Sequence, residues 1–336
     1  MTIDTEEDIW GDFHNTRPPV TNVQQIVKLQ DICEKYSAIP TYLVNYPVAS
    51  DESSVQLLNS YYRENKCDIG SHCHPWNTPP IEEKIGSRQS FLCNIPSYDL
   101  VFRKIRNLHR KIEMAFHMSP SVFRAGRWGF GPNVLKALRA LNYKTDTSIT
   151  PFCDWGEAGG PVFSSTRNSP YRIAVNGQFH LNAWQSHQID KFSGCMLEIP
   201  PTIGYLQKKF SHLHMIRTYL RKRPCSWLRI LGILDRLSLL NYRWLSPELS
   251  SSEDMITLAR RILENGGQTL NMSFHSTSLL PGKSPFVRDE GDLEAFLSKI
   301  DSFLRFAESM GIPCVGMSSA AELLQNEPTR ESRESK

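Results

Sequence analysis

The sequence has none of the segments that would place it across a membrane or direct it to export. No run of about 18 consecutive apolar residues occurs among its 336 residues, so no membrane-spanning helix is predicted. The N-terminal segment carries the acids Asp4, Glu6, Glu7 and Asp8 instead of the basic region and apolar stretch of a signal peptide. We therefore expect a cytoplasmic protein.

Closely spaced cysteines and a strong net charge are also missing. The eight cysteines are scattered, and no two of them have the short spacing of a zinc knuckle or of a dense disulfide framework. Reduced thiols are therefore expected. The formal net charge of +3 is too small to indicate binding of nucleic acid.

Three common catalytic signatures do not occur. The sequence contains no phosphate-binding glycine loop, no Gly-x-Ser-x-Gly nucleophile turn and no dinucleotide-binding fingerprint. The main nucleotide-dependent enzyme classes and the serine hydrolases with that turn are therefore not indicated.

Basic residues are concentrated in one segment. Between Gly204 and Arg243 lie nine basic residues and a single acid, Asp235, interleaved with apolar residues. This pattern predicts a basic amphipathic helical segment, which can bind an anionic membrane surface or an anionic glycan. A solvated helix face over the core is the equally acceptable alternative.

Short apolar runs and helical patterns alternate along most of the chain. Such alternation predicts a parallel sheet covered by helices, and this number of units favours a barrel over two open sheets. Strands are expected over 2–5, 41–45, 67–72, 121–125, 144–149, 195–199, 269–274 and 313–317. Helices are expected over 23–36, 53–65, 98–117, 133–141, 254–265 and 293–310.

Three stretches interrupt this rhythm. Residues 75–96 and 151–170 have the composition of long loops, and 204–252 is the basic helical insertion. Long ordered loops in a compact domain usually carry function. We expect one barrel domain over 1–325, with a disordered charged tail over 326–336.

Reactive side chains follow several of the expected strands, where the active site of a parallel barrel lies. Asp4, Glu6 and Asp8 share one face while the backbone stays extended, and Glu7 points away. Three carboxylates on one face repel unless a cation or an arginine offsets them, which is typical of a site. An exposed acidic turn is the alternative.

His72 and His74 follow the third expected strand and also share a face. Two imidazoles and a carboxylate with open positions suit a catalytic Zn, Fe, Co or Mn ion. A pair of structural histidines beside Trp76 would give the same pattern. The carboxylates expected at the same rim favour the metal site.

Other residues at this rim are suited to positioning and proton transfer. Arg124 can hold a carboxylate base in its ionised form, whereas Arg127 has a surface salt bridge as its alternative role. His275 ends an apolar strand and is a candidate general acid. Trp76, Trp128 and Trp155 lie in or beside the rim loops, where indoles stack on sugar rings or fill the barrel mouth.

The sequence resembles the polysaccharide deacetylase family with NodB homology, carbohydrate esterase family 4, over nearly its whole length. The likeness rests on five stretches in the family's order, and within the family the branch of lipopolysaccharide-biosynthesis deacetylases is the most similar. These stretches are Thr2-Ile3-Asp4-Thr5-Glu6-Glu7-Asp8, Asp68-Ile69-Gly70-Ser71-His72-Cys73-His74-Pro75, Phe123-Arg124-Ala125-Gly126-Arg127, Asp146-Thr147-Ser148 and Phe274-His275-Ser276.

The resemblance implies a distorted (β/α)7 barrel with one divalent metal ion, zinc being the first choice and Co, Fe, Mn or Ni the alternatives. Asp4 then corresponds to the catalytic base, Arg124 to the residue that tethers it, and His275 to the general acid. His72 corresponds to the first metal histidine. Asp146 belongs to the fourth stretch, and we group it with Trp76, Arg127 and Trp128 as candidate substrate-binding residues.

Two positions depart from the family pattern. Thr5 follows Asp4 where an aspartate usually binds the metal, so that role passes to Glu6, with Asp8 as the alternative. Trp76 stands where the second histidine is usual, so His74 must substitute, with Cys73 as an outside alternative.

The function implied is metal-dependent hydrolysis of an N-acetyl group on an amino sugar, in polysaccharide or lipopolysaccharide metabolism. The substrate is then an amino sugar or glycan, in free or lipid-linked form, and residues 204–243 could contact a membrane peripherally. Two alternatives remain open: an allantoinase-like hydrolase of a cyclic amide, and a non-catalytic glycan-binding relative.

Overall fold

The computed structural model describes residues 1–11, 18–81, 86–173, 196–221 and 230–326. An eight-stranded curled sheet lies at its centre, in the order β10-β1-β2-β3-β4-β5-β7-β6. The strands are β1 (Thr2–Thr5), β2 (Thr41–Val44), β3 (Asp68–Cys73), β4 (Val122–Ala125), β5 (Thr145–Asp146), β6 (Tyr171–Ile173), β7 (Met196–Glu198) and β10 (Ser273–His275).

Seven of these strands, all except β6, are joined by parallel pairing, and β6 pairs antiparallel with β7 at one edge. In the described part of the chain β6 and β10 remain the two edges of the sheet, so the barrel is not closed by hydrogen bonds. The predicted distorted (β/α)7 barrel is thereby confirmed.

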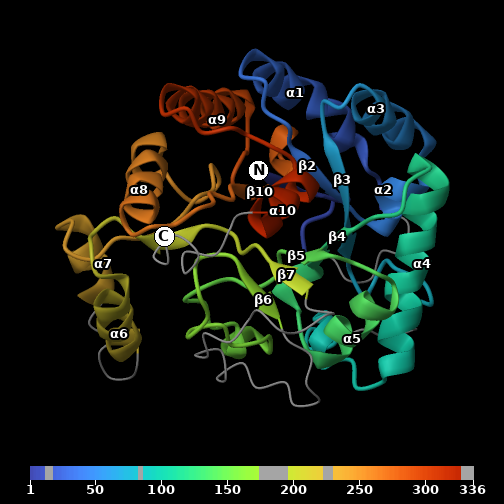
Figure 1. Ribbon diagram of the computed structural model, residues 1–336, viewed down its shortest axis with the longest axis horizontal. Coiled ribbons are helices and arrows are strands. Elements are labelled where there is room, and N and C mark those ends of the chain that lie inside the picture. The colour runs from blue at the N-terminus through green and yellow to red at the C-terminus, as the bar shows by residue number, and fades with distance from the viewer. Residues whose placement is uncertain (12–17, 82–85, 174–195, 222–229, 327–336) are drawn as a thin grey trace, which may run out of the picture.

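Helices cover the outside of the curled sheet (Figure 1). Each predicted helix is present, with ends that agree to within a few residues. The helices on the sheet are α1 (Ile26–Lys35), α2 (Tyr46–Ser50), α3 (Glu52–Arg63), α4 (Tyr98–Phe116), α5 (Pro132–Ala140), α8 (Ser252–Glu264) and α9 (Glu290–Ser309). No described helix has the length and apolar character needed to cross a bilayer.

Side-chain caps define where these helices begin. Asp51, Ser97, Ser251 and Asp289 each accept a hydrogen bond from a backbone N–H in the first turn of α3, α4, α8 and α9 respectively. Such caps satisfy donors that have no partner within the helix. The main buried core runs from Ile3 in β1 to Phe306 in α9.

The strand predicted over 313–317 is wrong. This segment is irregular up to Met317, which begins α10 (Met317–Asn326). Pro313 has no N–H to donate, and Cys314 accepts a hydrogen bond from Ile39 N without any ladder forming. Met317 instead packs with Ala321 on Leu43 and other residues of the sheet.

The described residues of the predicted insertion over 204–252 include the helices α6 (Phe210–Arg221) and α7 (Ile230–Arg236). The insertion also contains most of a two-stranded antiparallel ribbon that the sequence did not predict, made of β8 (Ile203–Tyr205) and β9 (Tyr242–Trp244). Of the predicted tail, 327–336 lies outside the described residues.

Candidate active site

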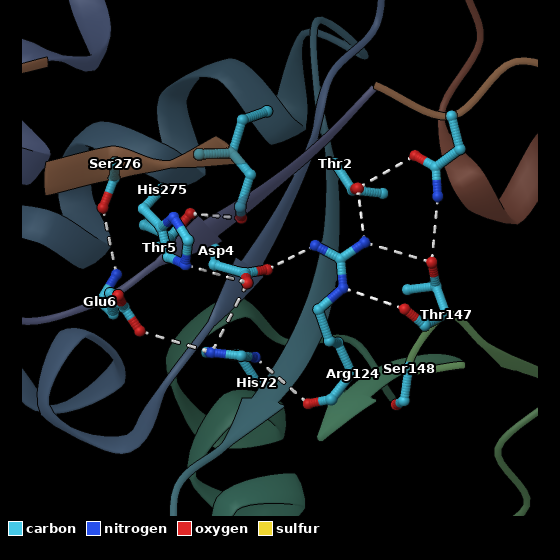
Figure 2. Close-up of polar contacts among 12 residues, drawn as sticks. Thr2, Asp4, Thr5, Glu6, His72, Arg124, Thr147, Ser148, His275 and Ser276 are labelled. Carbon is cyan, nitrogen blue, oxygen red and sulfur yellow. Dashed lines mark hydrogen bonds and ion pairs between the residues drawn. The ribbon is translucent and has the colours of Figure 1, made fainter. Parts of the chain in front are cut away.

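The carboxyl ends of β1, β3, β4 and β10 bring the predicted reactive residues together. Asp4 is paired in register with His275 on β10, and His72 is paired with Arg124 on β4. Figure 2 shows these side chains converging from neighbouring strands. Parallel strands present their carboxyl ends at one rim, so the grouping follows directly from the fold.

Arg124 fixes one oxygen of Asp4 deep in the barrel. The guanidinium is fully buried, and its Nη1 donates to Asp4 Oδ1 at 2.6 Å. Its other nitrogens donate to Thr2 Oγ1 at 2.7 Å, Thr147 Oγ1 at 3.2 Å and Thr147 O at 3.0 Å. Every side of the cation therefore has a partner, as a buried charge requires.

Asp4 is held in its ionised form. Burial alone would raise the pKa of this carboxyl, but the charges of Arg124, His72 and His275 outweigh burial and lower the pKa below its ordinary value. Oδ1 is occupied by Arg124, and the free Oδ2 lies 3.9 Å from His72 Nε2 and 3.8 Å from His275 Nε2. One basic oxygen therefore faces both histidines.

Glu6, His72 and His74 form a three-residue cluster whose donor atoms all lie within 4.8 Å of one another. Glu6 Oε2 is 3.4 Å from His72 Nε2 and 2.8 Å from His74 Nε2. Tetrahedral metal bonds of about 2.0 to 2.1 Å place neighbouring ligand atoms about 3.3 Å apart. The donor atoms thus have the chemistry and roughly the spacing of a Zn-type site.

The orientation of His72 also fits a metal ligand. Its Nδ1 lies 3.2 Å from the carbonyl oxygen of Arg124, which can only accept a hydrogen bond. Nδ1 must therefore carry a proton, so Nε2, which is directed at Glu6, is the nitrogen that would bind a metal once its own proton is displaced. Burial would raise the pKa of Glu6, but hydrogen bonds from His72 and His74 lower it well below its usual range.

His74 is positioned by packing. Its ring lies 4.0 Å from the ring of Trp76, and its buried Nδ1 has no hydrogen-bond partner among the described residues. A Cβ at Gly126 would overlap that nitrogen, so the ring needs glycine at this position. Trp76 in turn donates from Nε1 to Glu7 at 3.1 Å.

The two alternatives to Glu6 and His74 are directed elsewhere. Asp8 accepts hydrogen bonds from the backbone and side chains of Thr21 and Asn22, because the strand ends at Thr5 and the alternation of faces does not extend to residue 8. The side chain of Cys73 lies on the opposite face of β3 from His72, and burial raises its pKa to about 12. Neither belongs to the cluster.

The side chain of Thr5 does not point toward the candidate metal ligands. Its hydroxyl donates to Ile3 O at 3.0 Å within a fully buried strand. Adjacent strand residues point to opposite faces, so residue 5 faces away from His72 and the next residue, Glu6, faces toward it.

His275 has a partner that the sequence did not indicate. Glu248, in the loop after β9, lies 3.0 Å through Oε2 from His275 Nδ1, and its Oε1 accepts from His275 N at 3.0 Å. Ser278 Oγ donates to the same carboxylate at 2.6 Å. Burial would lower the pKa of His275, but Glu248 outweighs it and raises the pKa to about 10. Glu248 is distant in sequence, so only the fold reveals the pair.

A cavity of about 560 Å³ opens over these groups. Aromatic side chains form much of its wall: Trp10, Trp76, Phe91, Trp128, Trp155, Trp244 and Phe286. Of these, Trp10, Phe91, Trp244 and Phe286 were not predicted from the sequence. Trp10 is 44% exposed, with its ring 4.7 Å from His275 and 5.6 Å from Phe286. The acid candidate is thus flanked by an exposed indole.

Three of the four predicted substrate-binding residues line this cavity: Trp76, Arg127 and Trp128. Trp128 stacks against Arg124 at 4.9 Å, and Arg127 lies over Phe91 at 4.2 Å and bonds to Ser90. Asp146 is different, and its prediction as a substrate contact needs correction. It is fully buried outside the cavity wall, where its carboxylate accepts from Ser148 N and Oγ.

The buried position of Asp146 gives it a supporting role. Ser148 Oγ also accepts from Ala125 N at 2.8 Å, so Asp146 helps to fix the end of β4 just before Gly126. Burial raises the pKa of Asp146 and of its neighbour Glu198. The stretch Asp146-Thr147-Ser148 therefore holds the end of β4 in place, below the residues that line the cavity.

The sequence matches no protein-family model and no curated protein. Solved structures with a similar arrangement include a candidate polysaccharide deacetylase from Mycobacterium smegmatis, with 14% identity, a TM-score of 0.48 and coverage of 90% of this chain and 78% of the other. Peptidoglycan deacetylase PdaC from Bacillus subtilis has 11% identity, a TM-score of 0.42 and coverage of 99% and 92%.

Puue allantoinase is similar at 10% identity, with a TM-score of 0.45 and coverage of 89% of this chain and 71% of the other. At these TM-scores the likenesses do not distinguish a deacetylase from an allantoinase. The function proposed next therefore rests on the residues of the site.

Proposed function

We propose that this chain is a metal-dependent hydrolase that removes N-acetyl groups from an amino sugar in a glycan. One observation carries the proposal: the free Oδ2 of Asp4 lies between the metal-ligand cluster of Glu6, His72 and His74 on one side and His275 on the other. A base, three ligands and an acid around one cavity are the groups that amide hydrolysis needs.

The metal, held by Glu6, His72 and His74, would polarise the carbonyl of the amide and stabilise negative charge on its oxygen. Asp4 accepts a proton from the attacking water through Oδ2. Arg124 keeps the carboxylate ionised and prevents it from rotating toward the ligands, because it binds the other oxygen at 2.6 Å. The base is therefore fixed before the substrate arrives.

His275 donates a proton to the departing amine. Its raised pKa, about 10, keeps the imidazole protonated at neutral pH, and the positive charge of a bound metal would lower that value toward the working range. Glu248 holds the ring through Nδ1 and leaves Nε2 for the substrate, on the side of Asp4. Acid and base thus lie on one side of the cavity.

The aromatic wall supports a sugar as substrate. Indole rings at Trp10, Trp128, Trp155 and Trp244 offer flat apolar faces near the reacting groups, and sugar rings present the matching C–H faces. We extend the proposal to a glycan of polysaccharide or lipopolysaccharide metabolism, in free or lipid-linked form, handled in the cytoplasm. A small cyclic amide would leave most of this wall without contact.

The test is acetate release from N-acetylated chito-oligosaccharides by metal-loaded protein. Wild type should release acetate, and Asp4→Asn should lower kcat about 100- to 10,000-fold because the base is lost. Metal content of Asp4→Asn should stay near that of wild type, since Asp4 is not a ligand. Full activity of the variant, or hydrolysis of allantoin in place of the sugar amide, would contradict the proposal.

The non-catalytic interpretation has its own outcome in this experiment. A glycan-binding relative would bind the oligosaccharide and release no acetate, whichever metal is supplied. Its support was the change at residues 5 and 76, but Glu6 and His74 offer donor atoms in place of the usual ones.

A further inference from the structure

Exposed large apolar side chains are unevenly distributed over the described residues. Fourteen such side chains are exposed, and six of them lie within the short stretch 215–239 of the insertion. They are Met215, Ile216, Tyr219, Ile233, Leu237 and Leu239, exposed by 66, 48, 67, 55, 62 and 57%. A concentration of this kind usually marks a docking surface.

On α6 these residues form a second apolar stripe. Phe210 is buried on the side that faces the protein, and Arg217 lies 3.8 Å over the ring of Tyr242 on that side. Met215, Ile216 and Tyr219 have the spacing of one helix face and lie opposite. One apolar face is enough to pack α6 against the protein, so folding of the chain does not account for the second apolar face exposed to water.

The neighbouring helix α7 extends the same surface. α6 and α7 pack together at the edge of the molecule, away from α4 and α5 (Figure 1). Ile233 is in α7, and Leu237 directly follows its last residue with its N–H bonded to Ile233 O at 3.0 Å, so the two lie one turn apart. Leu239 lies in the turn that follows the helix. We call Met215, Ile216, Tyr219, Ile233, Leu237 and Leu239 the insertion face.

Positive charge lies at the ends of the two helices that carry the insertion face: Lys208 and Lys209 directly precede α6, and Arg221 and Arg236 are the last residues of α6 and α7. Lys208, Lys209, Arg221 and Arg236 are exposed, and none of them forms an ion pair with the described residues. The acid of the segment, Asp235, is engaged by Arg243 at 2.6 Å. Two copies of this face would bring like charges together, whereas an anionic surface would neutralise them.

We propose that the insertion face docks on the surface of a bilayer that contains anionic phospholipid. α6 and α7 lie in the plane of the interface, with the apolar stripe among the acyl chains and the four cations at the phosphate level. Apolar burial and charge attraction then act on the same surface. This inference does not depend on the proposed catalytic activity.

The test is co-sedimentation of the full chain with vesicles of phosphatidylcholine, alone or mixed with phosphatidylglycerol. Wild type should bind the mixed vesicles, and binding should weaken as salt is added. Met215→Ser/Ile216→Ser/Tyr219→Ser should reduce binding at least about tenfold. Arg221→Gln/Arg236→Gln should reduce it about thirtyfold, with a weaker salt dependence.

Met114→Ser/Met310→Ser is the matched control, because it removes exposed apolar side chains on other helices, 74 and 47% exposed, and should bind as wild type does. Circular dichroism of each variant checks folding, which exposed positions should not disturb. Equal binding to neutral and mixed vesicles, no binding by wild type, or concentration-dependent self-association through the insertion face would overturn the proposal.

Discussion

The floor and the rim of the cavity are built in different ways. The floor consists of Asp4, Glu6, His72, His74 and Arg124, which are fixed at or just beyond strand ends and almost entirely buried. The rim consists of Trp10, Trp128, Trp155, Trp244 and Phe286, which lie largely in the connecting segments. Strand register and buried hydrogen bonds fix the floor, whereas loop residues supply much of the rim. On the proposed function, we expect the floor to carry the chemistry and the rim to select the substrate.

The largest effect is expected where a ligand is removed from the floor. His72→Ala should lose the metal and lower activity at least about a thousandfold, because metal stabilisation is worth several kcal/mol. Asp8→Asn is the matched control, since Asp8 bonds to Thr21 and Asn22 outside the cluster. Metal analysis and acetate release measure both. Metal loss in Asp8→Asn with retention in His72→Ala would reverse the ligand assignment.

Arg124→Ala should show how much the buried ion pair between Arg124 and Asp4 contributes to the free energy of unfolding. Asp4 would be left buried without its cation, so the free energy of unfolding should fall by about 3 to 5 kcal/mol. Arg127→Ala, at the rim, should cost only about 1 kcal/mol because the side chain is partly exposed. Urea denaturation compares the two. Equal losses would mean that floor and rim are equally important for stability.

Glu248 lies in the loop after β9 and contacts His275, the candidate acid. Glu248→Gln should therefore change the pH dependence of activity. Loss of the carboxylate should lower the pKa of His275 from about 10 toward its ordinary value of 6.5. The alkaline limb should then shift to lower pH, with activity at pH 8 lower by at most about thirtyfold, since a bound metal already lowers the starting pKa. Ser278→Ala, which removes only a hydrogen bond to Glu248, should shift it less.

The same pair contributes to stability with a defined sign. The folded-state pKa of His275 is raised, so its contribution is fully present below the unfolded value of about 6.5 and is lost as pH rises through about 10. Glu248→Gln should remove this dependence from the unfolding free energy. If the pH dependences of activity and of the unfolding free energy both stayed unchanged, Glu248 would not set the pKa of His275.

The smallest effect is expected at the rim. Trp10→Ala should raise KM for the oligosaccharide about three- to tenfold and leave kcat nearly unchanged, because a stacking face is lost while the base, the acid and the candidate metal ligands are all retained. Trp10→Phe retains an aromatic face and should restore most of the affinity. A fall in kcat at unchanged KM would show that Trp10 acts in the chemical step instead of in substrate binding.

Most strands and helices were predictable because their patterns are local. Alternating apolar runs, cap residues and turn residues identify an element without knowledge of its partners. The segment 313–317 was the exception, since an apolar run becomes a strand only where a neighbouring strand offers hydrogen bonds. The ribbon of β8 and β9 was missed for the same reason.

The sequence by itself determined which residues could carry chemistry: Asp4, Glu6, His72, His74, Arg124 and His275 all follow or end strands, and strand order places them at one rim. Only the tertiary structure shows that Glu6 and His74, and not Asp8 and Cys73, lie together with His72, because this grouping depends on where the strands end and which face each side chain takes. It also supplied Glu248 and Trp10, whose roles come from contacts with His275 across long sequence separations.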